Sequence, residues 1–156
     1  MKSVGFRAEL GINEGFDAQK NQNISIRISE LCKQLQQLQK DVEEQTGIYI
    51  ATIVSGPNRS IYKTEWDCPV GGEISYTIHA ISDRRTDSKL QLKKDSWSDI
   101  EWMRAALILA EKIRTGFGQE YMAVEFMNRH GFSSYILNSE RDLTTNLREL
   151  ELEEEN

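Results

Sequence analysis

The sequence has few of the residue types on which recognisable sites are usually built. Two cysteines, two histidines and two prolines occur among 156 residues. Cys32 falls in a predicted helix and Cys68 in a predicted turn, so they form no disulfide framework, and a reducing, cytoplasmic setting is expected. Cys32, Cys68, His79 and His130 also lack metal-ligand spacing, and we therefore expect no metal.

Long apolar runs and excess positive charge are missing too. The first residues contain no apolar segment typical of a signal peptide, and no later run approaches the length that spans a membrane. The net charge is −6, of which −5 falls in residues 140–156, so the remaining body is nearly neutral. Binding to a phosphate backbone relies on positive charge, so the sequence predicts neither nucleic acid nor membrane as a partner.

Sequence motifs that identify a reaction or a bound cofactor are absent as well. The sequence has no glycine-rich phosphate loop ahead of a helix and no G-x-S-x-G element. The glycines of Gly116-Phe-Gly118 follow a predicted helix, where they suit a C-cap and a turn. We therefore expect no cofactor.

Hydrophobic periodicity is what the sequence does provide. Apolar residues alternate at every second position, then repeat every three to four, in the order β-α-β-β-α-β. This order predicts a ferredoxin-like α/β sandwich with a four-stranded antiparallel sheet, central first and third strands, and two helices on one face. The expected strands are residues 4–10, 48–55, 73–81 and 121–126, and the expected helices are residues 24–42 and about 98–115.

Several local signals refine this fold. Pro57 cannot donate a ladder hydrogen bond, so it predicts an edge strand or a bulge. The Gln-rich stretch 34–39 is interpreted as the solvated side of the first helix. The second helix is apolar nearly all round and needs a cover, which a short helix near the C-terminus could supply. We expect a single domain over residues 1–139, followed by a short acidic helix and tail over residues 140–156.

The sheet face turned away from the helices is the candidate site. It carries an unusual mixture of apolar and polar residues, and Arg7, Glu9 and His79 are its polar centre. Glu9 and His79 could form an acid–base pair if their strands are neighbours, although a cross-strand or interface hydrogen bond is favoured. The apolar members, Tyr49, Ile53, Ile81 and Tyr121, indicate an interface between copies of the chain. A ligand pocket is the alternative.

One short segment has a known counterpart. Val54-Ser-Gly-Pro-Asn-Arg-Ser-Ile-Tyr62, followed by Trp66 and Gly-Gly-Glu73, resembles the long hairpin of CutA-type trimeric proteins. The rest of the chain departs from that pattern. The resemblance implies oligomerisation and supports the fold without assigning the chain to that family.

The sequence alone therefore leaves the function unknown and favours one of two hypotheses. The preferred one is a non-catalytic, homo-oligomeric binding or assembly module. The alternative is a small enzyme with a pocket on the open sheet face at a subunit interface. Arg7, Glu9 and His79 would then line that pocket around a small-molecule ligand.

Overall fold

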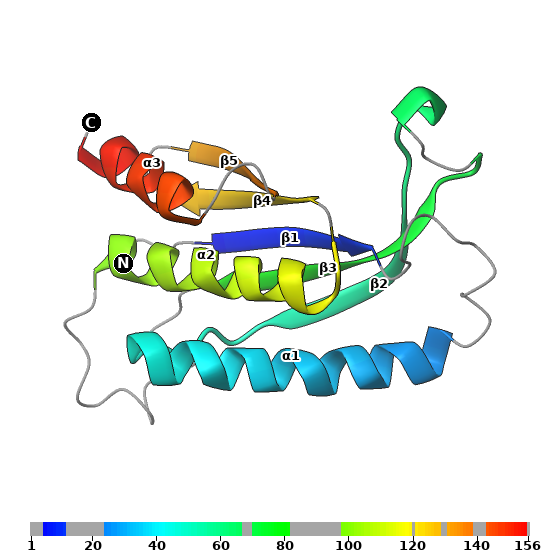
Figure 1. Ribbon diagram of the computed structural model, residues 1–156, viewed down its shortest axis with the longest axis horizontal. Coiled ribbons are helices and arrows are strands. Elements are labelled where there is room, and N and C mark those ends of the chain that lie inside the picture. Colours follow the sequence, from blue (N-terminus) through cyan, green and yellow to red (C-terminus); the bar gives the residue numbers. More distant parts are fainter. Residues whose placement is uncertain are drawn as a thin grey trace.

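The computed structural model describes residues 5–11, 24–66, 70–81, 98–119, 121–128, 131–138 and 143–155. The chain has a mixed α+β fold with a five-stranded antiparallel sheet and three α-helices (Figure 1). The elements in chain order are β1 (Gly5–Gly11), α1 (Ile24–Thr46), β2 (Ile53–Ser60), a 3₁₀ turn (Thr64–Trp66), β3 (Glu73–Ile81), α2 (Asp99–Gly116), β4 (Tyr121–Asn128), β5 (Gly131–Asn138) and α3 (Leu143–Glu155).

The strands lie in the order β2-β3-β1-β4-β5, so β1 occupies the middle of the sheet. The prediction of four strands is wrong because β5 pairs with β4 along its whole length, from Gly131 opposite Asn128 to Asn138 opposite Tyr121. The second predicted strand is also displaced. Residues 48–52 are not a strand, and β2 begins only at Ile53 and continues through Pro57 to Ser60.

The cause of this displacement is a buried glutamine on α1. Gln39 is only 5% exposed, and its side-chain amide donates to the carbonyl oxygen of Ile50 at 2.8 Å and to the Thr52 hydroxyl at 3.0 Å. The Gln39 amide thus supplies the hydrogen bond to the Ile50 carbonyl that a neighbouring strand would otherwise supply. Residues 48–52 therefore pack against α1. The interpretation of stretch 34–39 as a solvated face is therefore wrong at Gln39. The hydroxyl of Tyr49, expected on the open sheet face, donates to Gln39 instead at 3.4 Å.

Other local predictions are confirmed. Pro57 lies in an edge strand, where the register between β2 and β3 shifts between Ser55 and Asn58. Helix α2 begins at Asp99, close to the expected residue 98, and the Ser98 side chain caps it by accepting from the Glu101 backbone N–H at 3.3 Å. The termini of these elements therefore follow from local backbone chemistry.

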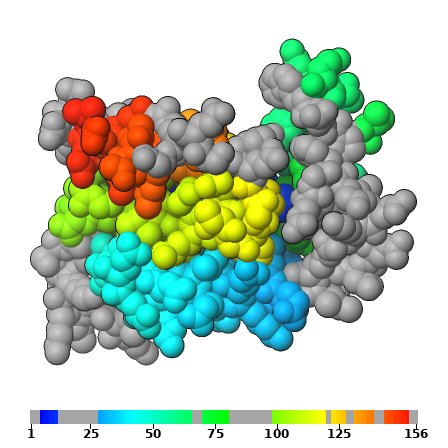
Figure 2. Space-filling view, viewed as in Figure 1, coloured from blue at the N-terminus to red at the C-terminus, as the bar shows by residue number. Residues whose placement is uncertain are grey.

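The core lies between one face of the sheet and the helices. Alternate residues of β1, β3 and β4 are buried against them, among them Phe6, Leu10, Ile78 and Phe126. Helices α1 and α2 are side by side, and α3 lies against the other flank of α2 (Figure 2). Leu150 of α3 is 1% exposed, so α3 is the cover that the apolar α2 requires.

Some predicted features fall outside the described residues. These are Cys68 and His130, and the side chains of Ile81 and Tyr121. Among the described helices, none is long and apolar enough to cross a membrane.

Candidate active site

The open face of the sheet carries a hydrogen-bonded network centred on Glu9. Thr77, its cross-strand neighbour on β3, donates its hydroxyl proton to Glu9 Oε1 at 2.5 Å. The Ser75 hydroxyl donates to Glu9 Oε2 at 3.2 Å. Arg7, two residues earlier on β1, donates to Oε1 at 3.4 Å. Both oxygens of the carboxylate are therefore held from the same side of the sheet.

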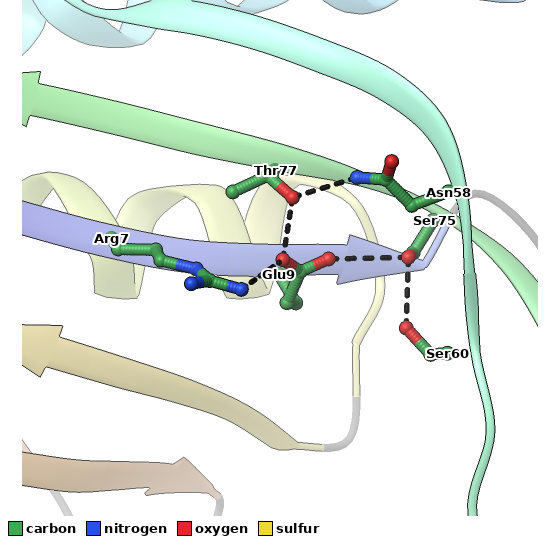
Figure 3. Close-up of polar contacts among 6 residues, drawn as sticks. All are labelled: Arg7, Glu9, Asn58, Ser60, Ser75 and Thr77. Carbon is green, nitrogen blue, oxygen red and sulfur yellow. Dashed lines mark hydrogen bonds and ion pairs between the residues drawn. The ribbon is translucent and has the colours of Figure 1, made fainter.

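The edge strand β2 adds an outer layer to this network (Figure 3). Asn58 donates its amide to the Thr77 hydroxyl at 2.8 Å, and the Ser60 and Ser75 hydroxyls lie 2.8 Å apart. Ser75 and Thr77 are 2% and 4% exposed although they face away from the helices. Strand β2 buries them because its register shift at Ser55/Asn58 brings Asn58 and Ser60 over β3.

One arrangement of the hydroxyl protons satisfies all of these hydrogen bonds. A hydroxyl has one proton, and the protons of Ser75 and Thr77 both go to Glu9. Ser75 must then accept from Ser60, just as Thr77 accepts from Asn58. In this arrangement the hydroxyl protons of Ser75 and Thr77 both point toward Glu9.

A pocket of about 450 Å³ opens beside this network. Its volume falls within the usual range for small-molecule sites, about 300–1,000 Å³. Arg7, Glu9, Asn58 and Thr77 give the pocket a polar part, and Ile61 and Tyr62, which follow the end of β2 and are 76% and 43% exposed, give it an apolar part. Arg59 and Ser60 complete its lining. The pocket thus combines charged groups with an exposed aliphatic and an aromatic side chain.

Of the three residues predicted from sequence, the structure brings two into the pocket. Arg7 and Glu9 are in contact and line it. His79 does not line it, because the register places His79 opposite Arg7 and Thr77 opposite Glu9. The hypothesised Glu9–His79 pair is therefore replaced by a Glu9–Thr77 pair. The pattern of alternation gave the correct face but not the register.

Glu73 is a polar residue near this site that the sequence interpretation missed. It begins β3 opposite Ser60. Its carboxylate lies directly over Gly11, where an added Cβ would stand 2.7 Å from Glu73 Oε1. Burial raises the pKa of Glu73 above 4.5. Gly11, at the end of the central strand, was a signal that a neighbouring side chain needs this space.

The end of β1 is held in place from α2. Arg114 is 9% exposed and donates to both carboxylate oxygens of Glu111, at 2.6 and 3.0 Å. The hydrogen bonds to Glu111 raise the pKa of Arg114, so its charge is permanent. Arg114 also donates to the carbonyl oxygen of Gln119, whose amide donates to the carbonyl oxygen of Gly11 at 3.0 Å. These hydrogen bonds tie Gly11, beside the Glu73 carboxylate, to the C-terminal end of α2.

Metal ligation finds no support in this part of the molecule. Within the described ranges, no group of three or more His, Cys, Asp or Glu side chains could hold a metal ion. The polar groups of the pocket are hydroxyls, an amide, two guanidinium groups and a carboxylate, which bind organic ligands through hydrogen bonds and charge.

Comparison with known proteins decides the family. The family model of the SAM lyases matches residues 1–132. This chain belongs to the SAM lyase family. The matched segment includes all eight residues that line the pocket. A search of curated proteins found no match.

Two solved structures are similar to the chain. A phage SAM lyase in complex with S-methyl-5′-thioadenosine is 16% identical, with 88% of this chain and 91% of that chain covered and a TM-score of 0.51. A phage SAM lyase in its apo state is 14% identical, with 89% and 91% covered and a TM-score of 0.49. At such low identity the likeness to the complex shows a shared fold.

Membership of a lyase family overturns the preferred hypothesis from sequence. The prediction of a non-catalytic binding or assembly module is wrong, and so is the description of the function as unknown. The alternative, a small enzyme with a pocket on the open sheet face, is the better supported one. The error arose because the fold hosts many functions and no catalytic motif is local in sequence. Likewise, the hairpin resemblance to CutA-type proteins did not identify the family.

Proposed function

We propose that this protein is an enzyme that cleaves S-adenosylmethionine and releases S-methyl-5′-thioadenosine. The observation that carries the proposal is the SAM lyase family match, which spans the whole pocket. The bond that breaks joins the sulfonium sulfur to the four-carbon amino-acid chain, and its electron pair stays on sulfur. The carbon chain then completes its valence in one of two ways. An oxygen of the substrate's own carboxylate attacks the carbon and closes a ring, or an adjacent C–H gives its proton to a base and its electron pair forms a double bond. Neither route adds water.

The two parts of the pocket suit the two ends of this substrate. Ile61 and Tyr62 offer an aliphatic and an aromatic surface for the adenosyl group. Arg7 and Glu9 offer a cation and an anion in the polar part. A substrate bound across the pocket would place its sulfonium between these parts.

The chemistry favours a site that leaves the sulfur itself without a tightly paired carboxylate. Cleavage discharges the sulfonium, so a carboxylate in contact with it would stabilise the ground state more than the transition state. Glu9 is already held by three donors in the polar part. We therefore assign Glu9 to binding and not to proton transfer.

The direct test is chromatographic measurement of S-methyl-5′-thioadenosine release from S-adenosylmethionine by the purified protein. We expect release to be catalytic and to saturate with substrate. A matched pair of variants, Tyr62→Ala in the pocket and Arg148→Ala on the exposed side of α3, locates the site. Tyr62→Ala should reduce kcat/KM, whereas Arg148→Ala should leave it unchanged. No release by the unmodified protein would overturn the proposal.

We propose further that copies of the chain associate through the open sheet face. Support comes from large apolar side chains that stand exposed on this face or at its edges, among them Ile53 at 71%, Phe132 at 78% and Ile136 at 55%. Such exposure on several strands is unusual for a face that meets only water. A face of this size could supply the roughly 800 Å² per partner of a typical interface.

Two finer predictions from sequence also stay proposals. We interpret β1 to β4 with α1 and α2 as a ferredoxin-like core to which β5 and α3 are added; the order β2-β3-β1-β4 supports this. A reducing, cytoplasmic setting is supported by Cys32, which is a free thiol.

A further inference from the structure

The polar part of the pocket contains a cation and an anion that are arranged side by side on one strand. Arg7 and Glu9 both face the open side of β1, with Arg7 Nη2 and Glu9 Oε1 3.4 Å apart. The Arg7 side chain is 55% exposed and that of Glu9 is 28% exposed. An exposed guanidinium thus lies next to a half-buried carboxylate at one wall of the same pocket.

The Glu9 carboxylate has acceptor capacity left for a ligand. An ionised carboxylate offers about four lone-pair sites. Within the described part of the chain, Thr77, Ser75 and Arg7 are the donors that reach it. Because Asn58 and Ser60 orient both hydroxyls toward Glu9, the carboxylate is fixed as an acceptor. A lone-pair site therefore stays open to a donor from a ligand, and a cationic donor would bind it most strongly.

Arg7 has the complementary capacity. A guanidinium carries five N–H donors in a planar fork, and the single bond to Glu9 uses one of them. Its cross-strand neighbours on the open face are His79 on β3 and Glu125 on β4. Glu125 is exposed, so water solvates its carboxylate and weakens its attraction for Arg7. An anionic ligand that accepted two hydrogen bonds from Arg7 would therefore bind the guanidinium more strongly than Glu125 does.

We infer that Arg7 and Glu9 form the subsite for the amino-acid end of the substrate, in which Arg7 binds the α-carboxylate and Glu9 binds the α-ammonium group. The inference rests on the proposed function, which supplies a substrate with a zwitterionic end. The α-ammonium keeps its charge when the sulfonium is discharged. Glu9 therefore stabilises substrate and transition state alike, and its loss should raise KM more than it lowers kcat.

The experiment compares three ligands that differ at this end, of which S-methyl-5′-thioadenosine also lacks the carbon chain and the sulfonium charge. S-adenosylmethionine carries both charged groups, its decarboxylated analogue keeps only the ammonium, and S-methyl-5′-thioadenosine carries neither. Arg7→Gln should raise the KM for S-adenosylmethionine by about tenfold or more, since each lost charge-assisted bond has about that effect. Arg7→Gln should leave the calorimetric Kd of the decarboxylated analogue and of S-methyl-5′-thioadenosine unchanged.

Glu9→Gln should weaken the binding of S-adenosylmethionine and of the decarboxylated analogue by similar factors. The Kd of S-methyl-5′-thioadenosine should stay unchanged. Lys33→Gln, an exposed charge change on α1, is the matched control and should alter none of the three. Circular dichroism melts check that Glu9→Gln, which disturbs the hydroxyl network, still folds. Arg7→Gln removes a mostly exposed side chain and tests the subsite independently of that risk.

The outcomes separate the subsite from the proposed function. An unmodified protein that releases no S-methyl-5′-thioadenosine from S-adenosylmethionine would overturn the proposed function and the subsite with it. An active protein whose Arg7→Gln and Glu9→Gln variants keep the original KM would overturn the subsite alone. Variants in which the binding of S-methyl-5′-thioadenosine is weakened as strongly as that of S-adenosylmethionine would also overturn the subsite, because that pattern means a general distortion of the pocket.

Discussion

The two faces of the sheet use the same strands for opposite purposes. On β1, Phe6, Ala8 and Leu10 are 3%, 1% and 0% exposed against the helices, whereas Arg7 and Glu9 between them face the pocket. On β3, Tyr76 and Ile78 are buried in the core, while Ser75 and Thr77 orient Glu9. The covered face is held by apolar burial, which tolerates small shifts. The open face is held by directional bonds, which do not.

The largest expected effect lies on the covered side. Leu107 in α2 is 0% exposed, and Leu35 in α1 is 3% exposed. Replacing either with alanine leaves a cavity and should lower the free energy of unfolding by about 2–5 kcal/mol. Urea denaturation measures this loss. Equal sensitivity at an exposed position of α1 would show that the helical face has been assigned wrongly.

Two glutamines of α1 sharpen the contrast. Gln39→Ala removes the donor that satisfies the buried carbonyl of Ile50 and should cost about 1–3 kcal/mol. Gln37→Ala loses an exposed contact with Asp41 and should cost less than about 0.5 kcal/mol. The denaturant midpoints of the two variants measure this difference in stability. Similar midpoints would mean that the Gln39 amide does not hold residues 48–52.

These two glutamines also show where sequence reasoning stops. The repeat of every three to four residues over 24–42 puts Leu31, Leu35 and Val42 on one stripe, and all three are buried, because burial follows the repeat. It could not separate Gln39 from Gln37, because a polar residue is buried only when a distant partner such as Ile50 satisfies it. The residues of the open face were predicted from the same periodicity as the core. The Glu9–Thr77 pair could not be predicted, because the pairing of residues across two strands depends on their register.

On the open face, the prediction concerns association. Ile53 is 71% exposed, so Ile53→Asp should change the stability of a single chain by less than about 0.5 kcal/mol. In an interface the same change would bury an unpaired carboxylate and should shift the particle toward monomer. Sedimentation velocity compares the two forms. A monomeric unmodified protein at tens of micromolar would contradict the expectation.

The smallest expected effect is the pH dependence of Glu73. Burial raises its pKa in the folded chain above 4.5, so the unfolded chain loses this proton first as the pH rises. Stability should therefore fall slightly between pH 4.5 and the folded pKa and then stay level. Glu73→Gln should remove this fall and be slightly more stable at pH 7. Thermal melts at several pH values measure it, and a variant that is less stable at pH 7 would refute it.

The two edges of the sheet differ in how they resist unwanted strand pairing. Strand β2 is interrupted by Pro57 and by a register shift, which deny an incoming chain a continuous row of backbone donors and acceptors. Strand β5 pairs with β4 over all eight of its residues without a break, and its exposed side chains include Phe132 and Ile136. Aggregation from the native state should therefore begin at β5. A lysine in place of Phe132 would improve the solubility of the protein at high concentration.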